Sequence, residues 1–198
     1  YKLTWDGTAV ESDYELAETI GELEVKKSTK ELKVESADGE WTYDGNAHTN
    51  KTYTVTYGDE TLSGTEGQVE FTLSTGDKLT VVPATSATIT HVAEGEVANA
   101  FTWSVENESF YTKGEDTVGT LTVNPATLTI VTESDSKEYD GEELTADGSI
   151  SGFVTPEGGE QETATFEVTG SQTEVGKSNN TYKLTWDGTA VESDYELA

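Results

Sequence analysis

One 17-residue sequence occurs twice in the chain, at positions 1–17 and 182–198. Both copies read YKLTWDGTAVESDYELA, and they are 181 positions apart. Chance does not produce an identity of this length, and self-similarity at a fixed period is the signature of a repeat protein. We therefore expect the parent protein to repeat with this period in nearly identical copies, and this chain to span one period plus a short overlap.

A weaker repeat divides the period into two related units. Three pairs of segments carry it: 43–45 with 139–141, 101–103 with 184–186, and 119–123 with 21–25 of the next period. The first pair has an offset of 96, and the other two pairs have an offset of 83. The two units therefore share both ends, and one of them has a longer middle, by 96 minus 83 positions.

These matches predict the boundaries of the units. The longer unit, named unit B, covers residues 28–125, and the shorter unit, named unit A, covers residues 126–198. Residues 1–27 correspond to the last strands of a preceding, incomplete A-type repeat. By the same comparison, residues 126–198 lack the last strand of unit A, and residues 18–26 carry the sequence of that strand.

The segment 18–26 has an apolar stripe formed by Ile20, Leu23 and Val25. A sheet without its last strand exposes unpaired backbone groups, and such an edge invites strand pairing. We therefore expect this segment to pair outside its own two units, with a neighbouring copy of the repeat in a head-to-tail contact. A contact between opposite ends of a rod does not close, so it would build a filament.

Apolar and polar residues alternate along much of the chain, which is typical of half-buried strands. The alternation is clearest in the segments 53–57, 69–73, 78–82, 88–90, 101–103, 121–123 and 164–168. Of these, 69–73 and 164–168 are expected at comparable places in the two units. Turn signals such as Asp-Gly lie between the segments, and helical periodicity is weak. We expect an all-β chain of two tandem immunoglobulin-like β-sandwiches arranged end to end, each with about seven or eight short strands.

Composition limits what the chain can bind. The net charge is −28, the pI is near 4.1, and all 11 basic residues are lysines. Such a field repels nucleic acid and anionic membranes, and without arginine the planar, bidentate recognition of phosphate is absent. Because cysteine and methionine are both missing, a secreted chain of this kind is stable without disulfides and escapes thiol oxidation. We expect an extracellular location, on a cell surface or anchored in a cell wall.

The boundary between the two units resembles a known family. The stretch LTVNPATLTI at 121–130, followed by YDG at 139–141, is similar to the MBG/YDG-type repeats of large surface proteins from Gram-positive bacteria. The stretch VTGSQT at 168–173 is also similar to these repeats. The resemblance covers both units, although unit B departs from it in the middle. It implies Ig-like domains in tandem arrays on adhesin-like proteins, and it carries no catalytic motif.

The sequence offers two candidate sites, one for a ligand or a contact between units and one for a metal ion. Trp41 has no counterpart in unit A, where Lys137 takes its place, so Trp41 is a candidate for sugar stacking or for a contact between units. Asp135 and Asp140, near the boundary between the units, could share a calcium ion that stiffens a rod. Calcium takes about six to eight oxygen ligands, and no EF-hand pattern is present, so a solvated acidic face is the alternative.

The chain offers no arrangement typical of an enzyme. The only histidines, His48 and His91, fit polar strand positions, and nothing in the sequence points to a third group that would orient either ring. We expect no enzymatic activity, and no cofactor other than calcium. The main hypothesis is a structural stalk or spacer in a long extracellular adhesin of bacteria that is either a surface protein or fibre-forming. The alternative is a module that binds host glycan, mucin or matrix by multivalency.

Overall fold

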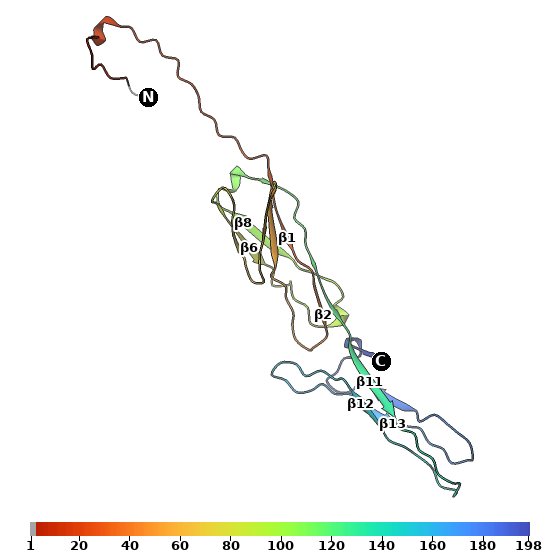
Figure 1. Cartoon of the computed structure of the whole chain (residues 1–198). Helices are drawn as coiled ribbons and strands as arrows, with labels where there is room; N and C mark the ends of the chain where they lie inside the picture. The colour runs from red at the N-terminus through yellow and green to blue at the C-terminus, as the bar shows by residue number, and fades with distance from the viewer. Residues whose placement is uncertain (1–2) are drawn as a thin grey trace.

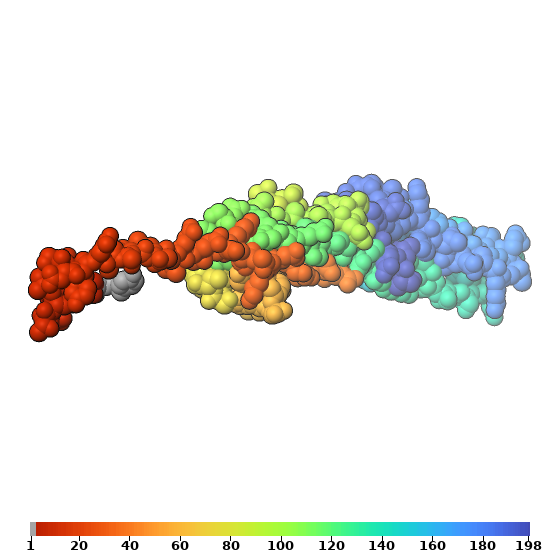
Figure 2. Space-filling model, turned by 90° about the horizontal axis from the view of Figure 1, so that it is seen from above, coloured from red at the N-terminus to blue at the C-terminus, as the bar shows by residue number. Residues whose placement is uncertain are grey.

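The structure is a computed structural model that describes residues 3–198. These residues form strands and four short 3-10 helices, which confirms the all-β class. Unit B and unit A follow one another along an elongated body, and residues 3–27 extend from the end of unit B that lies away from unit A (Figure 1). A view turned by 90° shows the same order, with unit A at the opposite end from the N-terminal segment (Figure 2). Within residues 3–198, no helix has the length and apolar character needed to cross a bilayer.

Unit B contains ten strands within residues 28–125. They are β1 Glu31–Ser36, β2 Gly39–Thr42, β3 Tyr53–Tyr57, β4 Glu60–Ser63, β5 Glu70–Thr72, β6 Lys78–Pro83, β7 Val97–Ala98, β8 Phe101–Val105, β9 Thr112–Lys113 and β10 Thr120–Asn124. Three sheets result, in the orders β4-β3-β1-β9, β2-β10-β7 and β5-β6-β8. The 3-10 helices η2 Val92–Glu94 and η3 Glu108–Phe110 lie between strands. The alternating segments 53–57, 78–82, 101–103 and 121–123 are confirmed as β3, β6, β8 and β10, whereas 88–90 forms only an isolated bridge at Ile89.

The first hydrophobic cluster lies inside unit B. In β1 and β3 every second residue is buried, as expected for strands that turn one face to a core. The cluster consists of Leu32, Val34, Tyr53, Val55, Tyr57, Phe71, Leu73, Leu79, Val81, Val105 and Tyr111. Because it combines residues of two different sheets, these sheets face each other across a common core.

The first and last segments of unit B run side by side. Strand β1 pairs in parallel with β9, and after a short break β2 pairs in parallel with β10. In the second pair, Leu121 lies opposite Gly39 and Val123 lies opposite Trp41. Leu121 and Val123 are almost fully buried, so β10 closes the unit near its junction with unit A.

Unit A contains five strands within residues 126–198. They are β11 Ala126–Thr132, β12 Gly148–Ser151, β13 Thr165–Val168, β14 Tyr182–Thr185 and β15 Tyr195–Leu197, with the 3-10 helix η4 Glu192–Asp194 before the last. Strand β11 pairs antiparallel with β12 and parallel with β15, and β13 pairs antiparallel with β14. Five strands are fewer than the seven or eight expected for each unit.

The pairing registers show where the longer middle of unit B lies. Phe166 pairs with Leu184 in unit A, and Pro83 pairs with Phe101 in unit B, so both partners are shifted by the same offset of 83. Strand β13 therefore matches β6, and the expectation that 164–168 lies at the place of 69–73 is wrong. The first strands of the two units match at the offset of 96, whereas β6 and β13 match at the offset of 83. Strands β4 and β5 lie between these two regions of unit B and therefore have no counterpart in unit A.

Candidate functional site

The two units meet in a second hydrophobic cluster, named here the junction core. Strand β10 ends at Asn124 and β11 begins at Ala126, so only Pro125 lies between them. The buried members come from both sides of this point: Tyr43, Ile89, Leu121 and Val123 from unit B, and Ala126, Leu128, Ala190 and Tyr195 from unit A. The joint is therefore a packed interface and not a short linker alone.

A carboxylate of unit A holds two buried tyrosines in this core. The hydroxyl of Tyr43 donates to Oε1 of Glu162 at 2.7 Å, and the hydroxyl of Tyr195 donates to Oε2 at 2.6 Å. The two tyrosine rings meet edge to face, with centroids 5.6 Å apart. Burial, followed by the contact with Glu162, raises the pKa of both tyrosines well above the usual value of 10.0. Both hydroxyls therefore stay protonated as donors at neutral pH.

A second polar contact crosses the same interface. Asp194 of unit A is fully buried, and its carboxylate accepts from the backbone N–H of Val92 at 2.8 Å. Its other oxygen lies 2.7 Å from Nδ1 of His91. Both partners belong to unit B, where His91 is the N-terminal cap of η2. A buried charge needs such partners, because an unpaired one is costly.

The turn after Tyr43 adds contacts at the rim of the junction. Burial acts to raise the pKa of Asp44, but hydrogen bonds from Asn46 and His48 outweigh it and lower the pKa. The side chain of Asn46 then accepts from the backbone N–H of Glu157 in unit A, at 2.8 Å. Gly45 has a φ of 78°, a left-handed conformation that glycine adopts readily.

Trp41 lies in β2, beside this junction. Its ring stacks on His48, with centroids 4.8 Å apart and an angle of 11° between the planes. The side chain is half-buried and packs against the junction core. Of the two roles predicted for Trp41, the position agrees with a contact between units. Sugar stacking stays a prediction.

The segment after β11, which contains Asp135 and Asp140, lies at the end of unit A that is farther from unit B, so the expectation that these residues sit near the boundary between the units is wrong (Figure 1). The reason is that β11 carries the chain away from the junction before either residue is reached. A hydrogen bond from Lys137, first among the causes, lowers the pKa of Asp140, and Lys137 Nζ lies 2.9 Å from its carboxylate. Asp135 accepts from the N–H of Ser136 at 2.7 Å. Within residues 3–198 no three potential metal ligands cluster, and calcium binding by this pair stays a prediction.

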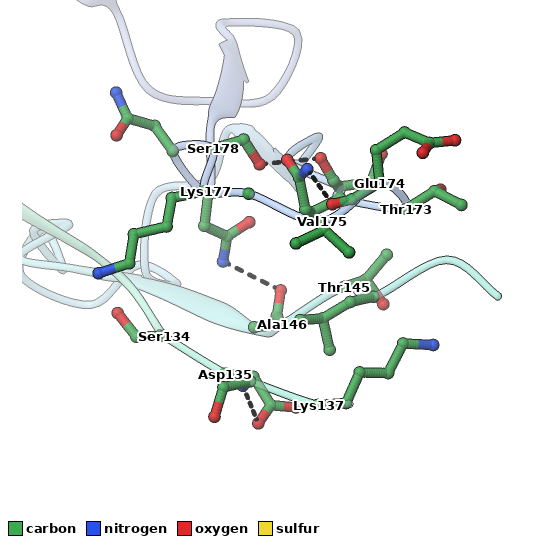
Figure 3. Close-up of a pocket in the computed structure, with 18 of the residues that line it drawn as sticks. Ser134, Asp135, Lys137, Thr145, Ala146, Thr173, Glu174, Val175, Lys177 and Ser178 are labelled. Carbon is green, nitrogen blue, oxygen red and sulfur yellow. Dashed lines mark hydrogen bonds between the residues drawn. The ribbon is translucent and has the colours of Figure 1, made fainter. Parts of the chain in front are cut away.

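The same end of unit A carries a groove of about 700 Å³. Residues 133–139 and 144–146 form one side, and residues 170–180 form the other. Figure 3 shows these sides facing each other, with Val175 pointing into the space between them. The side chain of Asn180 joins the two sides, since Nδ2 donates to the carbonyls of Glu133 and Ala146. Its Oδ1 is buried without a hydrogen-bond partner.

The predicted pairing segment lies at the opposite end of the body. Ile20, Leu23 and Val25 are 83%, 100% and 99% exposed, and no strand forms between residues 3 and 30. The chain becomes anchored at Ser28, whose N–H donates to the carbonyl of Phe110 at 2.9 Å. The expected pairing needs a second copy of the chain, and it stays a prediction.

Sequence reasoning missed the polar residues of the junction. His91 is a cap and a partner of Asp194, not a polar strand residue, and Glu162 had no predicted role. One signal was present: the repeated 17-residue sequence contains Asp194 and Tyr195, so both were candidates for a contact that every copy needs. Compared with protein-family profiles, with curated proteins and with solved structures, the chain matches none.

Proposed function

We propose that this chain is a spacer repeat in the stalk of a long extracellular surface protein of bacteria, of the MBG/YDG type. In this proposal each unit is an Ig-like β-sandwich, and successive units stand in line to hold another part of the protein away from the cell. The observation that carries it is the junction core, in which Tyr43 of unit B and Glu162 and Tyr195 of unit A share buried hydrogen bonds. A spacer needs stiff joints, and flexible linkers do not provide them.

Three further features support a mechanical role. The body is elongated (Figure 1), and buried residues of both units pack together where the two units are joined. The high negative charge, −28, keeps neighbouring stalks apart and soluble. The 181-residue period adds length in equal steps.

The alternative is a glycan- or matrix-binding module that acts by multivalency. Its main candidate, Trp41, has a half-buried ring stacked on His48, and this arrangement uses the ring inside the protein. We therefore favour the spacer. A glycan array on the whole chain tests the alternative, which requires binding above background that is lost in Trp41→Ala.

The stiffness of the joint can be measured with two spin labels. The chain has no cysteine, so Ser109→Cys in unit B and Ser151→Cys in unit A, both exposed and both outside the groove at the far end of unit A, would be the only labelled positions. We expect one narrow distance distribution, and a broader one when Asp194→Ala weakens the junction. Asp13→Ala is the matched control, because Asp13 is the same position in the other copy of the repeated sequence. A broad distribution in the parent chain would refute the spacer.

A further inference from the structure

The two units keep a common framework that allows position-by-position comparison. In unit B, His48 forms an isolated bridge with Ile89, and in unit A Leu144 forms one with Gln172. The first partners of the two bridges are 96 positions apart and the second partners 83, which are the two offsets of the internal repeat. The bridge therefore occupies the same place in both units, although its side chains differ.

An asparagine joins the same two segments in each unit, although the two asparagines are 81 positions apart and not 83. In unit B, Nδ2 of Asn99 donates to the carbonyls of Ala37 and Asn50, each at 2.8 Å. In unit A, Nδ2 of Asn180 donates to the carbonyls of Glu133 and Ala146, at 3.0 and 3.2 Å. Both acceptors are shifted by 96 positions between the units. Asn180 and Asn99 thus tie together the same two segments of their units.

In unit B, the last strand of the unit, β10, completes this framework. Strand β10 lies in parallel beside β2, and Leu121 and Val123 turn into the junction core. Just before β10, the N–H of Gly119 donates to Oγ of Ser36 at 2.9 Å, and its carbonyl accepts from the N–H of Asn99 at 2.8 Å. Gly119 therefore provides a partner for the backbone N–H of Asn99 and for the hydroxyl of Ser36.

In unit A, the corresponding place is the groove. Residues 135–138 match β2 at an offset of 96, yet they are exposed and form no strand. No segment within residues 126–198 lies where β10 lies in unit B. Tyr139, which matches the buried Tyr43, is 66% exposed, and Val175, which matches the half-buried Val92, is 86% exposed. The unsatisfied Oδ1 of Asn180 lies at the same site.

Residues 21–25 have the sequence that this place requires. They match Gly119 and the start of β10: Gly21 corresponds to Gly119, Leu23 to Leu121 and Val25 to Val123. Leu23 and Val25 are almost completely exposed, whereas Leu121 and Val123 are 0% and 6% exposed. The segment cannot reach the groove of its own chain, because the two lie at opposite ends of the elongated body (Figure 2).

We propose that a segment with the sequence of residues 21–25, supplied by another copy of the repeat, docks in the groove between residues 133–146 and 170–180 as an added parallel strand; a second copy of this chain supplies it in the experiments below. The register follows from β2 and β10: Leu23 lies opposite Asp135, and Val25 lies opposite Lys137. The N–H of Tyr139 then donates to the carbonyl of Lys26, as the N–H of Tyr43 donates to the carbonyl of Asn124 at 2.8 Å. Docking covers the two apolar side chains of the strand together with Val175 and Tyr139.

The glycine makes this contact selective. A Cβ on Gly119 would lie 2.5 Å from the carbonyl oxygen of Ala37, so only glycine fits between the segments. A Cβ on Gly21 meets nothing within 4 Å in the free chain. Gly21→Val should therefore leave the fold of the chain unchanged and block docking. Gly7→Val is the matched control, because a Cβ on Gly7 also meets nothing within 4 Å and Gly7 lies outside the docking segment.

A complementation experiment with the full chain tests the proposal. Sedimentation velocity of the parent chain and of Gly7→Val should show assembly that grows with concentration, whereas Gly21→Val should weaken it by about a hundredfold or more. Val175→Glu places a charge in the groove at an exposed position and should block the acceptor side. Neither blocked variant assembles alone. Their mixture should form dimers that grow no further, because one variant supplies the groove and the other supplies the strand.

Three results would overturn the proposal: a parent chain that stays monomeric up to about 1 mM, a Gly21→Val chain that assembles like the parent, or a mixture that gives no dimers. Hydrogen exchange adds a local readout, since the amide of Tyr139 should exchange at least about tenfold more slowly in the assembled state. The docking does not depend on the spacer role. The stiffness experiment uses labels within one chain, so each idea can fail without the other.

Discussion

The buried carboxylate of Asp194 offers the sharpest test of the junction, because the repeat supplies its own control. Asp194 is fully buried between His91 and Val92, whereas Asp13, in the same sequence at the other copy, is exposed. We expect Asp194→Ala to destabilise the chain and Asp13→Ala to leave it unchanged. Both aspartates lie at the same place in the repeated sequence. Any effect of the substitution on the unfolded chain is therefore the same in both variants and cancels when they are compared.

The size of the effect follows from the two interactions that the alanine removes. The hydrogen bond from the Val92 N–H to a buried carboxylate contributes about 1.5–3 kcal/mol. The interaction with His91 contributes about 1 kcal/mol or less, since the histidine side chain is 47% exposed. Asp194→Ala should therefore lower the free energy of unfolding by about 3 kcal/mol. Asp194→Asn keeps an acceptor for Val92 and should cost about 1 kcal/mol.

Urea denaturation followed by circular dichroism measures this decrease in stability. With an m-value of about 1–3 kcal/mol/M, the midpoint should fall by about 1–3 M in Asp194→Ala. Asp13→Ala should stay within about 0.5 kcal/mol of the parent chain. Hydrogen exchange should then locate the damage, with faster exchange in β11 and β15 and little change in β1 and β3. If both alanine variants are destabilised equally, the junction of Asp194 with unit B contributes nothing and our reasoning is refuted.

The remaining predictions concern the two tyrosines of the junction core, Gly119 and the net charge of the chain. The pKa of Tyr43 and Tyr195 is raised in the folded chain, so the stability they supply is complete below about pH 10 and is lost as the pH rises further. Melting temperatures from about pH 9 to pH 12 should fall steeply in the parent chain and less steeply when both residues are Phe. Gly119→Ala should cost about 1–3 kcal/mol in urea denaturation, because its Cβ would clash with Ala37, whereas Gly21→Ala should cost nothing. Sodium chloride should raise the melting temperature by screening the net charge of −28, and a decrease would contradict self-repulsion.

Much of the secondary structure follows from the sequence, because apolar and polar residues alternate along a half-buried strand. Strand β3, with buried Tyr53, Val55 and Tyr57 between two threonines, is the clearest case. The segment 88–90 has the same alternation, but it forms one bridge only. Alternation reports which residues can face a core, and it does not report whether a neighbouring strand continues long enough to pair.

The candidate site was harder to predict, because its contacts join residues far apart in the chain. Tyr43 and Glu162 are 119 positions apart, and His91 and Asp194 are 103 apart. No local pattern marks a glutamate that receives two tyrosine hydroxyls. The repeat marks Asp194 and Tyr195 as candidates, since both lie in the repeated segment 182–198. It does not show which surface of unit B these two residues contact.

The two copies of the repeated sequence separate local from long-range causes of structure. Both form a short 3-10 helix, with Val10 at φ −105° and Val191 at φ −104° before it. The aromatic pair also forms in both, with ring centroids 5.5 Å apart for Trp5 and Tyr14 and 5.9 Å apart for Trp186 and Tyr195. The strands differ: β14 and β15 form in the second copy, which lies beside β13 and β11, and no strand forms in residues 3–17. The turn is therefore encoded locally, whereas each strand depends on a partner. By the same reasoning, residues 21–25 need a groove before they become a strand, and the groove at the far end of unit A has the backbone and the apolar side chains to provide it.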